Sequence, residues 1–167
     1  GYSDYLHPYD ETHLIGVGKN TVEAEEGYFA WYQGIKISLF DVSNVTNPVQ
    51  TANYTIGDRG SDTPVLSDHK AFLFDREKNL LVIPVAEAKV DESQYPSGVP
   101  PNAYGQVVWQ GAYVFDLTAE NGFNLDPAQI EKKITAKTRA ILPVHLFGEP
   151  AEMDAIKKIA KKHRLPI

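Results

Sequence analysis

Residues 31–43 read WYQGIKISLFDVS, and residues 108–118 read VWQGAYVFDLT. Both stretches hold an aromatic residue, Gln-Gly, an alternating apolar run, and then Phe-Asp followed by an aliphatic and a hydroxyl residue. The two pairs, Phe40-Asp41 and Phe115-Asp116, are 75 residues apart. Alternation of apolar and polar side chains is typical of a half-buried strand. We therefore predict that the two stretches occupy equivalent strands of one repeated unit.

A hairpin pattern precedes each of these stretches. Residues 5–18 turn at Asp10–Thr12, and residues 69–86 turn at Asp75–Asn79 between two apolar runs. Strand-like runs that are separated by a few turn-forming residues are typical of antiparallel hairpins. Each copy is therefore expected to contribute three consecutive antiparallel strands.

The first copy also has a fourth strand, because a turn sequence leads into VQTANYTI (49–56). Four short antiparallel strands repeated at a long period are typical of propeller blades. We predict a four-stranded blade over residues 5–57 and a three-stranded blade, lacking its fourth strand, over residues 69–118, packed beside it. Insertions at residues 21–30 and 86–104 explain the long period, and the second is expected to be an exposed, acidic, proline-containing loop.

Five segments of this part carry a family resemblance. In chain order they are GYSDYLHPYDETHLIGVGK (1–19), GIKISLFDVSNVTNP (34–48), IGDRGSD (56–62), DHKAFLFDREKNLLVIPV (68–85) and VWQGAYVFDL (108–117). Residues 1–123 resemble the secreted β-propeller family that is distantly related to WD repeats. The resemblance implies a propeller domain on an extracellular protein. The chain holds only part of such a ring, and open blade edges favour self-association.

The composition changes near Phe123–Asn124. Residues 1–123 hold 17 of the 18 aromatic side chains and 7 Lys/Arg against 17 Asp/Glu, whereas residues 124–167 hold 9 Lys/Arg against 5 Asp/Glu. Aromatic and β-branched residues favour sheet, whereas Ala, Lys and Glu at helical spacing favour helix. The expected fold class is therefore mixed: a partial β-propeller of about two antiparallel blades over residues 1–123, followed by a short α/β segment over residues 124–167.

The last 44 residues show a helix–strand–helix pattern. A capping sequence at Asp126–Gln129 starts the first helix. The apolar run RAILPVHLFG (139–148) is typical of a buried parallel strand. AEMDAIKKIAKKH (151–163) forms the second helix, and Leu165–Ile167 begins another strand. This order is typical of a slice of a doubly wound sheet.

That slice, NLDPAQIEKKITAKTRAILPVHLFGEPAEMDAIKKIAKKHRLPI (124–167), is similar to the DegT-type family of pyridoxal-phosphate-dependent sugar aminotransferases. The resemblance implies amino transfer to a nucleotide-linked keto-sugar, with a Schiff-base lysine and an acidic residue at the pyridinium nitrogen. Both residues and the phosphate-binding loop fall outside the slice. No catalytic, cofactor-binding or metal-binding residue is therefore assigned. No cofactor is expected in this chain, although the complete family uses pyridoxal phosphate.

Bulk properties exclude several classes of function. The net charge of −6 argues against a nucleic-acid partner, because neutralising phosphates needs a basic surface. The chain has no cysteine, which excludes disulfides and thiolate metal sites. No run reaches the roughly 18–20 apolar residues of a membrane span. The partners are otherwise unknown.

The segment HPYDETH (7–13) is the strongest candidate for a metal site, since it gathers His7, Asp10, Glu11 and His13. It lies in a strand–turn–strand rather than on a helix, so a structural role is favoured. His69 precedes the second hairpin as His7 precedes the first, which indicates a repeated packing or hydrogen-bonding role. Metal binding at His7, His13 and His69 stays open.

Other motifs are weaker. GVGKN (16–20) lacks the full spacing of a phosphate-binding loop. Two N-glycosylation acceptor sequences begin at Asn44 and Asn53 and fit an extracellular origin. His145 and His163 are expected to be structural. Loop carboxylates that could bind calcium, but lack the spacing of a calcium loop, are Glu23, Glu25, Glu26, Asp91 and Glu92.

The sequence as a whole favours a composite chain: a non-catalytic propeller fragment, acting as a binding or structural module, joined to an incomplete aminotransferase segment. The alternative is a fragment of a pyridoxal-phosphate-dependent nucleotide-sugar aminotransferase. The two parts imply different cellular locations, extracellular for the propeller part and cytoplasmic for the aminotransferase part. Both chain ends are those expected of a cut chain, and the joint near 123/124 has three explanations: it is natural, deliberate, or the product of a truncated or mis-joined reading frame.

Overall fold

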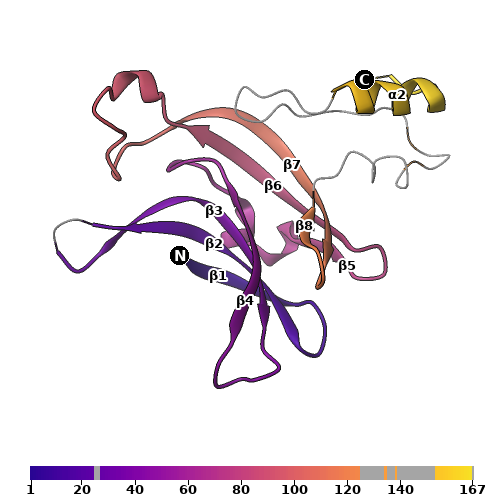
Figure 1. Ribbon diagram of the computed structural model, residues 1–167, viewed down its shortest axis with the longest axis horizontal. Helices are drawn as coiled ribbons and strands as arrows, with labels where there is room; N and C mark the ends of the chain where they lie inside the picture. The colour runs from indigo at the N-terminus through magenta and orange to yellow at the C-terminus, as the bar shows by residue number, and fades with distance from the viewer. Residues whose placement is uncertain (25–26, 125–133, 135–137, 139–152, 167) are drawn as a thin grey trace. The chain divides into compact units, whose positions relative to one another are not determined.

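The computed structural model describes residues 1–24, 27–124, 134, 138 and 153–166. The chain forms two compact units, Gly1–Asn124 and Leu125–Ile167. The first unit consists of two antiparallel sheets, and the described part of the second unit is mainly one helix (Figure 1).

The first sheet has four strands in the order β1-β2-β3-β4. Their bounds are Tyr2–Pro8 (β1), His13–Glu23 (β2), Ala30–Asp41 (β3) and Val49–Ile56 (β4). Each strand pairs antiparallel with the next one along the chain. This sheet confirms the predicted four-stranded blade.

The second sheet has the same order, β5-β6-β7-β8. Its strands are Leu73–Asp75 (β5), Leu80–Lys89 (β6), Gln106–Thr118 (β7) and Gly122–Asn124 (β8). The prediction of only three strands is wrong, because the chain turns back after Thr118 and β8 pairs with the end of β7. Gly122, with a φ of 67°, takes up the left-handed conformation that this turn needs. A strand of three residues is too short to show an alternating pattern in the sequence.

Three short 3-10 helices lie in the connections. They are η1 (Pro64–Leu66) and η2 (His69–Ala71) between the sheets, and η3 (Glu92–Gln94) between β6 and β7. Thr63, Asp68 and Asp91 cap them by accepting backbone N–H groups. These caps satisfy donors that a short helix leaves without a partner.

The two Phe-Asp pairs occupy equivalent strands, as predicted, because β3 and β7 are each the third strand of their sheet. The proposed equivalence of His69 with His7 is wrong. In the first sheet, His7 pairs with Ile15, which is the third residue of β2. In the second sheet, Leu73 pairs with Val82, which is the third residue of β6. Leu73 is therefore the equivalent of His7, whereas His69 lies in η2.

The core lies where one face of each sheet meets the other. Fully buried side chains on these two faces are Ile15, Val17, Ile37 and Leu39 from the first sheet and Leu81, Ile83, Phe115 and Leu117 from the second. Ring contacts cross the boundary, at 5.1 Å between the centroids of Tyr54 and Phe115 and at 5.5 Å between those of Tyr9 and Phe74. Burial of this apolar area is the main stabilising contribution to the unit.

The two sheets use opposite faces in this contact. Phe115 is fully buried against the first sheet, whereas its repeat equivalent Phe40 is only partly buried and faces away from the second sheet. The residue that precedes each phenylalanine shows the opposite pattern, because Leu39 in the first sheet is buried and Val114 in the second sheet is exposed. The sheets therefore stack front to back, in the same direction, as successive blades do.

The two insertions have different structures. Residues 21–30 extend the β2–β3 hairpin, with Thr21 paired to Tyr32 and Glu23 to Ala30. Residues 86–89 belong to β6, and the rest of the second insertion forms a loop with an exposed proline-containing tip.

In the second unit, helix α2 (Met153–His163) confirms the predicted helix over its described residues. Ile156 and Ala160 are buried, with Ile134, Ile159 and Leu165 packed against them. The expected first helix and the expected strand at 139–148 lie outside the described residues. Within the described ranges, no helix is both long and apolar enough to cross a membrane.

The front-to-back stacking predicts unequal effects for two equivalent substitutions. Phe115→Ala should lower the free energy of unfolding by about 3–5 kcal/mol, because it empties a fully buried site. Phe40→Ala should lower it clearly less, because water already reaches that ring. Urea unfolding followed by circular dichroism measures both, and equal losses would contradict the stacking direction.

Candidate functional site

Three aromatic rings surround the guanidinium group of Arg59. Its central carbon lies 4.3 Å from the ring centroid of Tyr32, 4.8 Å from that of Trp31 and 5.3 Å from that of Tyr104. A cation over the face of an aromatic ring is attracted by the ring's quadrupole. We call Trp31, Tyr32, Arg59 and Tyr104 the aromatic–arginine cluster.

Residues 57–62 hold Arg59 in place. The backbone N–H of Asp58 donates to the carbonyl of Ala88 at 2.9 Å. The hydroxyl of Ser61 accepts from the Ala88 N–H at 2.9 Å and donates to the Ala88 carbonyl at 3.2 Å. Asp62 forms a bridge with Ala86. The connection between the sheets is therefore fixed along β6.

Two glycines allow this close approach. Gly57 and Gly60 have φ values of 64° and 111°, which L side chains rarely adopt. A Cβ atom on Gly60 would also lie 3.0 Å from the carbonyl oxygen of Gly105. The two glycines of IGDRGSD therefore allow Arg59 to lie between the rings. Larger residues at these two positions would strain the backbone.

The rings come from both sheets. Trp31 and Tyr32 lie in the extended β2–β3 hairpin, and Tyr104 lies in the loop between β6 and β7. The side-chain amide of Gln33 donates to the Pro101 carbonyl at 2.8 Å, and the hydroxyls of Tyr32 and Tyr104 lie 3.4 Å apart. The start of β3 thus meets the second insertion at one place.

Electrostatics support a fixed charge in the cluster. The Nε and Nη1 atoms of Arg59 are buried and have no hydrogen-bond acceptor within the described part of the chain. Such donors are costly to bury, and the surrounding rings offset part of that cost. The hydrogen bond with Tyr32 raises the pKa of the Tyr104 hydroxyl above its usual value. The Tyr104 phenol therefore stays neutral near pH 7.

A salt bridge lies beside the cluster. The buried Lys19 ammonium donates to the Ser61 carbonyl and to the Asp62 carboxylate, the latter at 3.2 Å. Asp62 itself is largely exposed. This pair ties β2 of the first sheet to the Arg59 segment.

The rim of the cluster is exposed and aromatic. Tyr104 is 57% exposed, Phe29 is 53% exposed, and Tyr28 is fully exposed. The Phe29 ring stands edge-on to Trp31 at 5.0 Å. Large apolar rings beside a fixed cation are a surface suited to binding.

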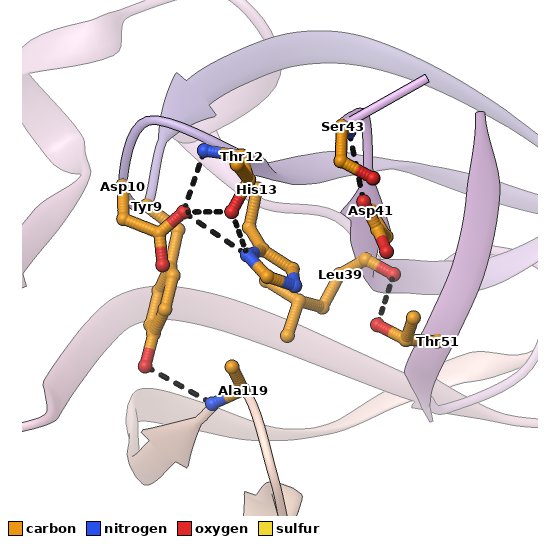
Figure 2. A network of polar contacts seen from close by, with 9 residues as sticks. All are labelled: Tyr9, Asp10, Thr12, His13, Leu39, Asp41, Ser43, Thr51 and Ala119. Carbon is orange, nitrogen blue, oxygen red and sulfur yellow. Dashed lines mark hydrogen bonds and ion pairs between the residues drawn. The ribbon is translucent and has the colours of Figure 1, made fainter. Parts of the chain in front are cut away.

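The segment HPYDETH has a different role, shown in Figure 2. One carboxylate oxygen of Asp10 accepts from the Thr12 N–H at 2.8 Å and lies 3.0 Å from Nδ1 of His13. Burial raises the pKa of Asp10, but hydrogen bonds from Thr12 and His13 outweigh it and hold the pKa below its usual value. This arrangement closes the β1–β2 turn.

The same turn joins the two sheets. The hydroxyl of buried Tyr9 accepts the Ala119 N–H at 3.0 Å, at the β7–β8 turn (Figure 2). His7 has different contacts from His13. Its ring centroid lies 4.8 Å from that of Phe72, and its Nδ1 lies 3.0 Å from the Tyr5 hydroxyl. The described residues contain no group of three or more His, Asp or Glu side chains placed to hold a metal ion.

The remaining candidates lie apart from one another. GVGKN runs along β2, Asp91 caps η3, and Glu23 ends β2. Asn44 caps its own turn by accepting from Thr46, and Asn53 lies exposed on β4. His69 is exposed and His163 lies near the end of α2. Glu25, Glu26 and His145 lie outside the described residues.

Comparison with known proteins gives the family. Residues 1–145 match the model of the family described as "Beta propeller domain". The chain belongs to this family. The match runs past the change in composition at Phe123–Asn124.

Individual relatives cover short stretches. An uncharacterized protein of Archaeoglobus fulgidus is 37% identical over 87 residues, which are 52% of this chain and 12% of that protein. The "Pleiotropic regulatory protein" of Geobacillus stearothermophilus is 58% identical over 45 residues, or 27% of this chain and 12% of that protein. A dTDP-3-amino-3,4,6-trideoxy-alpha-D-glucose transaminase of Streptomyces venezuelae is 58% identical over 43 residues, which are 26% of this chain and 11% of that protein.

These matches confirm both resemblances, to the propeller family and, over short segments, to sugar aminotransferases. The chain spans only 11–12% of the length of these three relatives. No solved structure matches it.

The lysines of α2 and the buried Lys19 do not fit pyridoxal phosphate. A Schiff-base lysine needs an enclosed pocket that favours its neutral form. Lys157, Lys158, Lys161 and Lys162 are all exposed on α2. Lys19 is buried, but it is paired with Asp62 inside the propeller part.

Proposed function

We propose that this chain is a non-catalytic binding module of the propeller type, which contacts a protein partner through the aromatic–arginine cluster and its rim. The observation that carries the proposal is the meeting of the start of β3, at Tyr32 and Gln33, with the second insertion around Arg59. The second insertion, which supplies Tyr104, is not needed to complete a four-stranded blade. A loop that lies against a rigid strand is a common way to build a site on a scaffold.

The composition of the surface favours a protein partner. Trp, Tyr and Arg dominate the energetics of protein interfaces, because their large rigid side chains bury area at a small entropic cost. Tyr104 and Phe29 are exposed, while hydrogen bonds to β6 hold the Arg59 segment in place beside Tyr104. The acidic propeller part, with 7 Lys/Arg against 17 Asp/Glu, favours a partner with basic residues around its contact surface.

Self-association belongs to the same proposal. The outer strands of the two sheets, β1, β4, β5 and β8, offer backbone groups with which a further chain can pair.

We also propose that the joint lies near 123/124 and that the propeller part is extracellular, while the aminotransferase-like part derives from a cytoplasmic protein. Support comes from the change in composition, from the end of the first compact unit at Asn124, and from the exposed Asn44 and Asn53. Expression through a eukaryotic secretory route should attach a glycan to either asparagine. Intact mass before and after a glycosidase measures it, and a secreted chain without any glycan would count against these sites.

The binding site can be tested without knowing the partner. Peptides selected from a random phage library against the folded chain should concentrate on the aromatic–arginine cluster. The double substitution Phe29→Ser/Tyr104→Ser should then weaken their binding at least about tenfold, because hot-spot side chains contribute about 2 kcal/mol each. Fluorescence anisotropy of labelled peptides measures the change.

Val45→Ser is the matched control, since Val45 is an exposed apolar residue in the turn before β4. It should leave the peptide affinities unchanged. Peptides that bind the double variant as tightly as the original chain would refute the proposed site.

The rival function, amino transfer, has its own test. Pyridoxal phosphate should form only weak, scattered Schiff bases, because the described tail lysines are exposed. Borohydride trapping followed by peptide mapping shows where the adducts form. One stoichiometric adduct on a single lysine, together with transfer of an amino group from glutamate to a keto-sugar nucleotide, would overturn the non-catalytic proposal.

A further inference from the structure

The guanidinium group of Arg59 has hydrogen-bond donors that no group in the described part of the chain accepts. Its Nε and Nη1 atoms are buried without an acceptor, whereas Nη2 is not enclosed and the residue as a whole is only partly buried. Each edge of a guanidinium group that can bind a carboxylate through two hydrogen bonds combines Nη2 with one of the other two nitrogens. An acceptor that reaches Nη2 can therefore also use one of the buried donors.

A second arginine shows the contrast with a partnered guanidinium group. The central carbon of Arg76 lies 4.3 Å from the ring centroid of Tyr9, the same distance as between Arg59 and Tyr32. Nη1 of Arg76 donates to the side chain of Asn79 at 2.9 Å. Arg76 thus combines an aromatic contact with a hydrogen-bond acceptor, whereas Arg59 has only aromatic contacts among the described residues.

The carboxylates on either side of Arg59 have other partners. Asp58 accepts the Val90 N–H at 2.9 Å and lies 3.5 Å from Nζ of Lys89. Asp62 pairs with the buried Lys19 at 3.2 Å. The charges of these two ion pairs cancel, so the positive charge of Arg59 has no counter-ion within the described ranges.

The rings around Arg59 stabilise its charge but accept none of its hydrogen bonds. Aromatic faces that stack on a guanidinium group leave the N–H groups along its edges for another acceptor. The hydroxyls of Tyr32 and Tyr104, which lie 3.4 Å apart, are further donors in the aromatic–arginine cluster. Donors and a positive charge without an acceptor make this a site suited to an anionic group.

We propose that the aromatic–arginine cluster binds one carboxylate of its protein partner, either an Asp or Glu side chain or a C-terminal carboxylate, through two hydrogen bonds from Arg59. This inference rests on the proposed function, because it names the group that the cluster recognises in that partner. The planar carboxylate matches the fork of N–H groups on a guanidinium group. Phosphate groups are typically bound by clusters of arginines, whereas Arg59 lies between Asp58 and Asp62 in the sequence.

The surroundings of the cluster define the rest of the partner segment. Residues 1–123 hold 7 Lys/Arg against 17 Asp/Glu, so further acidic groups on the partner would be repelled. The exposed rings of Tyr104 and Phe29 favour apolar neighbours of the carboxylate. We therefore expect one carboxylate within a segment that is otherwise apolar and basic.

Peptides that bind the cluster test the inference from the side of the ligand. In each selected peptide, every Asp is replaced in turn by Asn, every Glu by Gln, and the C-terminal carboxylate by an amide. One of these changes should weaken binding to the original chain at least about tenfold, because it removes a charge-assisted pair of hydrogen bonds. Fluorescence anisotropy measures the affinities, and the change that weakens binding tells a side-chain carboxylate from a C-terminal one.

The variant Arg59→Gln assigns the effect to this residue. On that variant, the same change in the peptide should weaken binding less than about twofold, because the interaction it removes is already lost. Arg76→Gln is the matched control, since it removes the same charge from an arginine that lies over an aromatic ring, and it should keep the tenfold effect. Far-ultraviolet circular dichroism confirms that both variants fold. The amide peptides on the original chain decide the question even if Arg59→Gln does not fold.

The outcomes separate this inference from the proposed function. Peptides that lose binding in Phe29→Ser/Tyr104→Ser but tolerate the loss of every carboxylate would overturn the carboxylate site and leave the binding module in place. A carboxylate effect of equal size on folded Arg59→Gln would place the donor elsewhere and would also overturn it. If no selected peptide depends on the cluster, the proposed function is refuted and this inference with it.

Discussion

Burial of Phe115 between the two sheets is the contact on which the rest of the propeller part depends. Its ring lies 5.1 Å from that of Tyr54 in the first sheet and 5.8 Å from that of Phe123 on β8. That contact, together with the Gln33–Pro101 hydrogen bond, holds β3 beside the β6–β7 loop and so keeps the rings around Arg59 together. The surface that we assign to binding is therefore a consequence of sheet packing.

The sequence was sufficient to predict the strands but not to predict which face of each strand is buried. The repeated Phe-Asp pattern identified β3 and β7 correctly, because it reports the position of a residue along a strand. Which face is buried depends on what packs against it, so Phe115 is inside and Phe40 is at the surface. The wrong equivalence of His69 with His7 has a related cause, since the helix η2 and the short β5 changed the spacing before the second hairpin.

The aromatic–arginine cluster could not be found from spacing. Trp31, Arg59 and Tyr104 are far apart in the sequence and meet only through the packing of two sheets. One signal pointed towards it: the second insertion, which holds Tyr104, was identified as an addition to the blade. The segment IGDRGSD was quoted only for the family resemblance, without a role for Arg59. A lone arginine between two glycines carries no chemical signature until its neighbours are known.

Binding at the cluster and stability of the sheet pair are linked. A partner that contacts Phe29 and Tyr104 together bridges residues from both sheets, so it binds the packed pair better than the separated one. Any ligand with that preference stabilises the packed form by mass action.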